Sequence, residues 1–110
     1  MADNDTLARL AATIKARRRE SADTSYTRQL LDAGTERCAK KFGEEAVEAI
    51  VAAFDSDPAH LTAEAADVLF HLLVLLESRN VALADVLAVL EKRGGTSGLD
   101  EKAARSRGMP

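Results

Sequence analysis

Apolar residues recur at the three-to-four-residue spacing of helices along most of the chain, and the strict alternation typical of strands is absent. The first predicted helix covers Thr6–Arg19, and Asp5 is its expected N-cap. A short helix then runs from Ser25, a second predicted N-cap, through Leu31. We expect it to end near Gly34, because glycine commonly terminates helices.

Two longer helices are predicted in the middle of the chain. The first covers Thr35–Phe54 and contains Gly43. A glycine inside a helix costs about 1 kcal/mol relative to alanine, so we expect another group to approach the backbone closely there. The second covers Pro58–Arg79, because Asp57 is a good N-cap and proline fits the first helical position. A last short helix covers Leu83–Arg93.

Composition favours one globular domain over residues 1–110, with an irregular tail over residues 96–110. Of the 110 residues, 46% are hydrophobic and 30% are charged, which is typical of soluble globular proteins. Only 4% are aromatic, so small aliphatic side chains must fill the core, and these favour close-packed helices. The predicted fold class is all-α, an antiparallel helical bundle with four to five helices per chain. The helix over residues 58–79 is apolar almost all round, so we expect homodimerisation to complete the bundle.

Charge and cysteine content exclude several classes of function. The chain has 15 basic and 18 acidic residues, and its net charge of -3 provides no general attraction to nucleic acid or to an anionic membrane. Cys38 is the single cysteine, which excludes an internal disulfide and a cysteine-based zinc site. The polar segment Met1–Thr6 does not resemble a secretory signal. The most apolar run, Val68–Leu76, is far shorter than the ~20 residues of a membrane span, so we expect a cytoplasmic protein.

Candidate chemistry comes from two pairs of acids, Glu45 with Glu48 and Glu64 with Asp67. Residues i and i+3 share one face of a helix, so each pair directs two carboxylates to the same side. Carboxylates are costly on a buried apolar helix unless they are paired or bind a metal. If the two long helices pack antiparallel, the pairs can face each other. Their hard oxygen ligands would suit Mg²⁺, with Mn²⁺ as a substitute.

Simpler interpretations stay open for the individual residues. One acidic pair on a helix is most often a solvated face. A di-iron site is disfavoured, because such bundles use Glu-x-x-His pairs. His71 is expected to be a buried polar partner of Asp67 rather than a general base. His60 is expected at the surface, and Cys38 is expected to be a small core residue.

The spacing Glu45-x-x-Glu48 followed by Glu64-x-x-Asp67 resembles the E-x-x-E…E-x-x-D signature of the MazG-like superfamily of all-α nucleoside triphosphate pyrophosphohydrolases. Other stretches narrow the resemblance to the phosphoribosyl-ATP pyrophosphatase family of histidine biosynthesis, over about residues 6–107. These stretches are Ser25-Tyr26-Thr27, Lys40-Lys41-Phe42-Gly43-Glu44-Glu45, and Gly95-Thr96-Ser97-Gly98-Leu99 with Lys102.

This resemblance implies hydrolysis of 1-(5-phosphoribosyl)-ATP to 1-(5-phosphoribosyl)-AMP and pyrophosphate by a Mg²⁺-activated water, the second step of histidine biosynthesis. It implies that the metal ligands are Glu45, Glu48, Glu64 and Asp67. We expect Glu44, beside them, to take part in catalysis by orienting a water or a second metal ion. A loop rich in glycine, serine and threonine can present backbone N–H groups to phosphate. The predicted substrate-binding residues are Lys41, Tyr26, Thr96, Ser97, Gly98 and Lys102.

Two other functions remain open on the sequence alone. A housecleaning pyrophosphatase that hydrolyses non-standard nucleoside triphosphates would use the same metal site. A non-catalytic helical dimerisation module would keep the acids for solubility or for the choice of partner. For the favoured function, the expected partners are a nucleotide substrate and a second copy of the chain, with no nucleic acid and no membrane.

Overall fold

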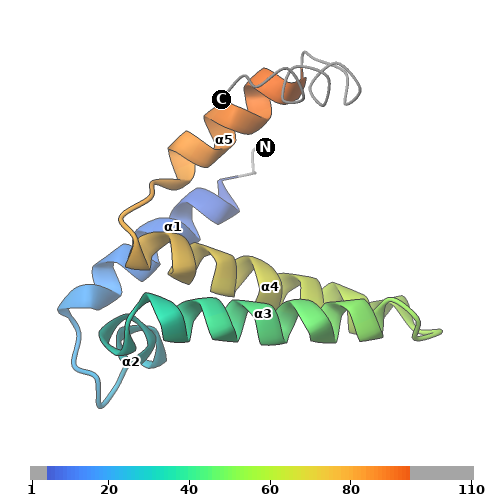
Figure 1. Cartoon of the computed structure of the whole chain (residues 1–110), viewed down its shortest axis with the longest axis horizontal. Helices are drawn as coiled ribbons and strands as arrows, with labels where there is room; N and C mark the ends of the chain where they lie inside the picture. The colour runs from blue at the N-terminus through green and yellow to red at the C-terminus, as the bar shows by residue number, and fades with distance from the viewer. Residues whose placement is uncertain (1–4, 95–110) are drawn as a thin grey trace.

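The computed structural model describes residues 5–94, and the regular structure in this range is entirely helical (Figure 1). The all-α prediction with four to five helices is therefore confirmed. The order is α1 (Thr6–Ala16), a 3-10 turn η1 (Arg17–Arg19), α2 (Tyr26–Ala33), α3 (Thr35–Ala52), α4 (Pro58–Ser78) and α5 (Leu83–Gly94).

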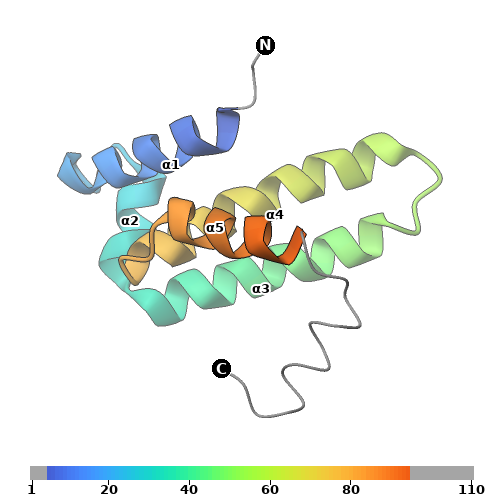
Figure 2. The ribbon, with the colours of Figure 1, turned by 90° about the horizontal axis from the view of Figure 1, so that it is seen from above.

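The two longest helices, α3 and α4, form an antiparallel hairpin and lie side by side along their length (Figures 1 and 2). The turn between them is stabilised by the predicted N-cap Asp57, whose carboxylate accepts a hydrogen bond of 3.0 Å from the backbone N–H of Ala59. Pro58 occupies the first helical position, as predicted. The hairpin therefore brings the two acidic pairs onto neighbouring helices.

The core lies at the end of the hairpin where α1 and α2 pack against the C-terminal half of α4 and the start of α3. Cys38 belongs to this core, as predicted, with 1% of its surface exposed. Its thiol donates to the carbonyl oxygen of Leu30 at 3.2 Å. The buried side chains that form this cluster are Ile14, Leu30, Cys38, Leu73 and Val74.

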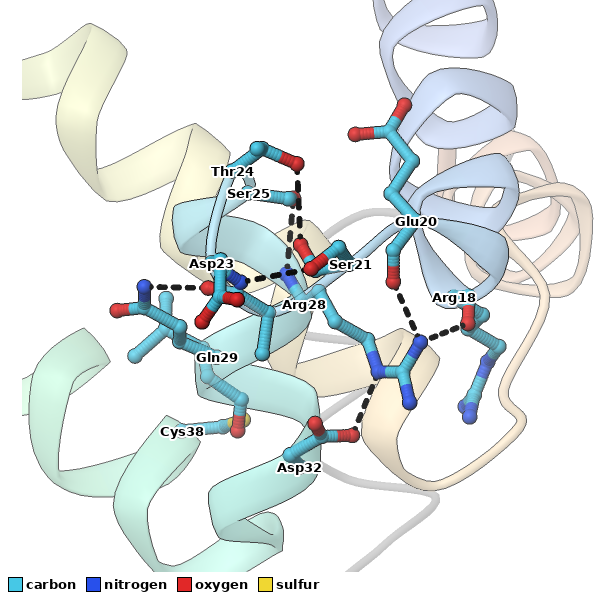
Figure 3. A network of polar contacts seen from close by, with 12 residues as sticks. Arg18, Glu20, Ser21, Asp23, Thr24, Ser25, Arg28, Gln29, Asp32 and Cys38 are labelled. Atoms are coloured by element: carbon cyan, nitrogen blue, oxygen red, sulfur yellow. Dashed lines mark hydrogen bonds and ion pairs between the residues drawn. The ribbon is translucent and has the colours of Figure 1, made fainter.

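The segment between η1 and α2 is anchored by the guanidinium of Arg28 (Figure 3). Its Nη1 donates to the carbonyl oxygens of Arg18 at 2.7 Å and Glu20 at 2.6 Å, and its Nε donates to Asp32 at 2.7 Å. Ser25 is the predicted N-cap, and its hydroxyl accepts from the backbone N–H of Arg28 at 3.1 Å. These bonds fix where α2 begins relative to α1.

Three details of the predicted helix ends differ from the structure. The first helix was expected to reach Arg19, but the α-helix ends at Ala16 and the last three residues form the 3-10 turn. The carboxylate of Asp5 makes no capping hydrogen bond, because its backbone (φ −90°, ψ 12°) is not in the extended conformation of an N-cap. The helix predicted to reach Phe54 ends at Ala52, after which the backbone continues through i→i+3 turn bonds.

The expectation of a close approach at Gly43 is also wrong for the part of the chain that the structure describes. A Cβ atom added at Gly43 would meet no atom within 4 Å. The glycine therefore lies on an open part of the α3 surface, and no contact explains its presence there.

The far end of the hairpin presents apolar side chains to solvent. Phe54 is the most exposed of them, with 86% of its surface accessible. Apolar groups gathered on one surface are commonly covered by a partner, so homodimerisation stays a prediction. The other exposed members of this apolar end are Val47, Ile50, Val51 and Leu61.

Among the described helices, α4 alone is long and apolar enough to cross a membrane, with a mean hydropathy of 1.5 over its most apolar window. Helices from the interior of soluble proteins meet the same criterion. In this structure α4 packs along α3 and carries Glu64, Asp67 and His71. The expected absence of a membrane stays a prediction.

Candidate metal centre

Three of the predicted metal ligands come together between α3 and α4. One carboxylate oxygen from each of Glu45, Glu48 and Glu64 lies within 4.8 Å of the other two. Glu45 and Glu48 share a face of α3 because they are three residues apart. The antiparallel hairpin then places Glu64 of α4 opposite that face. The arrangement predicted from spacing is therefore present for these three residues.

One carboxylate oxygen of Glu64 lacks a partner within residues 5–94. Its Oε1 atom is buried and has no hydrogen-bond partner among the described residues. Burial raises the pKa of Glu64, and the nearby carboxylates of Glu48, Asp67 and Glu45 raise it further. An oxygen that is both buried and unpartnered needs a cation or a proton. The centre therefore favours a positive ligand at Glu64.

Asp67 lies one turn after Glu64 on α4, outside the group of three converging carboxylates. Its side chain is exposed, and it contributes through its charge to the raised pKa of Glu64. Its role as a fourth metal ligand stays a prediction.

Lys41 lies beside two of the acids and close to Tyr26. The Nζ atom of Lys41 is 3.4 Å from Oε1 of Glu44 and 3.8 Å from Oε2 of Glu45. The pKa of Lys41 is raised chiefly by its electrostatic interaction with Tyr26 and further by Glu44 and Glu45, although partial burial opposes the rise. Tyr26 is half exposed at the start of α2. A cationic group and an accessible ring are thus available next to the acids, and the predicted roles of Lys41, Tyr26 and Glu44 stay predictions.

His71 lies behind this surface and is 6% exposed. Its ring packs edge-on against Tyr26 and Phe70, with centroid distances of 6.2 Å and 5.0 Å. Burial lowers its pKa, which favours the neutral imidazole. No hydrogen bond joins His71 to Asp67, and its Nδ1 has no partner in the described range. The expected partnership with Asp67 is therefore wrong, because His71 faces aromatic rings instead.

His60 adjoins the centre, which the sequence analysis did not predict. It is exposed, as expected, but its Nδ1 lies 2.9 Å from Oδ2 of Asp55 and its Nε2 lies 3.8 Å from Oε2 of Glu64. The available signal was its position four residues before Glu64, since i and i+4 share a helix face. The hydrogen bond that His60 donates to the carboxylate of Asp55 is the main reason that the pKa of His60 is raised.

Four predicted substrate-binding residues lie outside the described residues: Thr96, Ser97, Gly98 and Lys102. Within the described part, the atoms that could bind a metal ion are carboxylate oxygens, with the imidazole of His60 beside them. Carboxylate oxygens suit Mg²⁺ and Mn²⁺. A divalent cation held there could also bind the oxygens of a polyphosphate.

Comparison with known proteins gives consistent matches. The family model described as phosphoribosyl-ATP pyrophosphohydrolase matches residues 7–94. A protein named phosphoribosyl-ATP pyrophosphatase from Dinoroseobacter shibae is 63% identical over 99 residues, which cover 90% of this chain and 97% of the relative. One of the same name from Cereibacter sphaeroides is 61% identical over 99 residues, covering 90% and 96%. Phosphoribosyl-ATP pyrophosphatase 1 from Rhodopseudomonas palustris is 58% identical over 102 residues, covering 93% and 95%.

Proposed function

The chain belongs to the phosphoribosyl-ATP pyrophosphohydrolase family, and from this premise we propose that it hydrolyses phosphoribosyl-ATP to phosphoribosyl-AMP and pyrophosphate. This reaction adds one water across a phosphoric anhydride and is the second step of histidine biosynthesis. The observation that carries the proposal is the convergence of Glu45, Glu48 and Glu64 within 4.8 Å. Three carboxylates at this separation repel one another unless a cation lies among them.

The residues present fit a divalent cation. The buried and unpartnered Oε1 of Glu64 supports this fit, and so does the hard oxygen chemistry of the donor set. Glu45, Glu48 and Glu64, with Asp67 beside them, would hold Mg²⁺, for which Mn²⁺ can substitute. When bound, the ion would neutralise charge on the phosphate oxygens and lower the pKa of a water molecule.

The chain's own residues would bind and orient the substrate around this centre. Lys41 already faces carboxylates at 3.4 Å and 3.8 Å, and it can transfer these contacts to phosphate oxygens when substrate enters. Tyr26 is half exposed and offers a ring face to the base or ribose. Glu44 accepts from Lys41 and would be released to orient a water once Lys41 binds phosphate. Thr96, Ser97 and Gly98, together with Lys102, would hold another phosphate.

We further propose that the protein acts as a homodimer in the cytoplasm, attached neither to nucleic acid nor to a membrane. The exposed apolar end of the hairpin supports association, since Phe54 and its neighbours otherwise remain in water. The net charge of -3 supports the absence of a nucleic-acid partner.

The test is pyrophosphate release from phosphoribosyl-ATP with Mg²⁺ and with EDTA. We expect turnover to require the cation, and Glu48→Gln to lower kcat/KM by about 100-fold or more, since even residues that only orient metal ligands contribute 10–100-fold. Glu36→Gln is a matched control, because Glu36 is exposed in the first turn of the same helix. Circular dichroism of each variant verifies that the fold is retained.

Three results would contradict the proposal. Full activity in EDTA would show that the reaction needs no divalent cation. Full activity of Glu48→Gln would show that it does not need this carboxylate. Comparable turnover on dUTP or dITP would instead support a housecleaning pyrophosphatase.

A further inference from the structure

We propose that His60, oriented by Asp55, is an additional ligand of the metal centre and makes it a mixed nitrogen–oxygen site. A site with a nitrogen ligand prefers transition cations such as Co²⁺ over Mg²⁺. This preference is stronger than that of a site made of carboxylates alone. This inference rests on the proposed function, because it requires the carboxylates to hold a divalent cation.

The first support is the orientation of the imidazole. Nδ1 of His60 lies 2.9 Å from Oδ2 of Asp55. An ionised carboxylate only accepts hydrogen bonds, so Nδ1 must carry the hydrogen. In the neutral ring this leaves a lone pair on Nε2. A carboxylate that fixes the tautomer in this way is the usual outer partner of a metal-binding histidine.

The second support is the distance from that lone pair to the carboxylate cluster. Nε2 of His60 lies 3.8 Å from Oε2 of Glu64. Bonds from a cation to a histidine nitrogen and to a carboxylate oxygen are each about 2.1 Å long. Their sum exceeds the observed separation, so one cation can contact both atoms. Glu64 would thus link His60 to Glu45 and Glu48, which converge on it from α3.

The positions of Asp55 and His60 in the fold stabilise the orientation of the imidazole. Asp55 lies in the turn between α3 and α4, where its Oδ1 also accepts from the backbone N–H of Asp57 at 2.9 Å. His60 lies in the first turn of α4, four residues before Glu64, on the same face. The carboxylate that orients the imidazole is therefore itself held by the backbone.

A rival role for His60 is that of a protonated counter-ion for Asp55 and Glu64. The two roles make opposite predictions. A counter-ion competes with the metal for Glu64, so removing it would improve binding of every divalent cation. A ligand supplies a nitrogen, so removing it weakens binding of cations that favour imidazole and has little effect on Mg²⁺.

The experiment is calorimetric titration of the metal-free protein with Co²⁺ and with Mg²⁺, at about pH 8.5, well above the ordinary imidazole pKa. We expect His60→Ala to weaken Co²⁺ binding by about 10-fold or more and Mg²⁺ binding by less than about 2-fold. His60→Gln, which offers an oxygen instead, should not restore the preference for Co²⁺. The visible absorption band of bound Co²⁺ should shift in both variants.

Thr62→Ala is the matched control, because Thr62 is exposed on the same helix and its hydroxyl contacts only the carbonyl of Pro58 among the described residues. Equal changes for the two cations, tighter binding in His60→Ala, or an unshifted Co²⁺ band would overturn the inference while leaving the proposed function intact. A wild-type protein that binds neither cation would overturn both.

Discussion

Replacing Gly43 by alanine should stabilise the folded protein by about 1 kcal/mol. Glycine in a helix interior is less favourable than alanine by about this amount, because it loses more backbone freedom on folding. Gly43 lies in the middle of α3, and a Cβ atom there would meet nothing within 4 Å. No steric penalty within the described chain therefore offsets the gain.

The assay is thermal unfolding at one matched protein concentration, so that any association contributes equally to both proteins. For a domain of this size, 1 kcal/mol corresponds to a rise in Tm of about 4–8 °C. Ala39→Gly is the matched control, because Ala39 is exposed on the same helix and its replacement should lower Tm by a similar amount. An unchanged or lower Tm for Gly43→Ala would refute the reasoning, because the added methyl group would then be meeting atoms that the described chain does not supply.

Three further predictions concern the carboxylates and the core. Glu64→Gln should raise the Tm of the metal-free protein at neutral pH. Burial and neighbouring carboxylates raise the pKa of Glu64, so the wild-type protein loses stability as the pH rises through the folded-state pKa and Glu64 becomes ionised. The difference should disappear below the ordinary pKa of 4.5, and unfolding scans in EDTA at both pH values will measure it. His60→Ala should lower Tm most at a pH below 6.5. The hydrogen bond from His60 to the Asp55 carboxylate raises the pKa of His60, so its contribution to stability is lost as the pH rises through the folded pKa. The loss of Tm in His60→Ala should also become smaller as acid protonates Asp55, whose pKa is lowered by the Asp57 N–H and then by His60. A loss of Tm that does not change with pH would contradict the reasoning. Val74→Ala removes two methyl groups from a side chain with 0% exposure and should cost about 2–3 kcal/mol in urea unfolding, whereas a cost below about 1 kcal/mol would show that the core is loosely packed.

Helix boundaries were predictable where the chemistry is local. Ser25 and Asp57 act as caps because the acceptor and the backbone N–H lie within three residues of each other. Asp5 is the same kind of residue at the same kind of position, but its backbone dihedrals prevent capping. A sequence pattern indicates which residue can cap a helix, and the backbone conformation of that residue decides whether it does.

The carboxylate cluster was predictable to the extent that helical periodicity and the hairpin determine it. The spacing of Glu45 and Glu48 places them on one face, and the antiparallel partner supplies Glu64. Periodicity does not fix side-chain rotamers, so it does not reveal that Asp67 lies outside the converging group. It also does not reveal that Asp55, in a turn, reaches His60. Turn geometry and rotamers become visible only in the folded chain.

The converging carboxylates all belong to the α3–α4 hairpin, so fewer than about twenty residues separate them along the chain. Closing so short a loop costs little entropy, and structure built from near neighbours forms early. The carboxylate cluster can therefore form as soon as this hairpin exists. A cation bound at that stage would join the two helices.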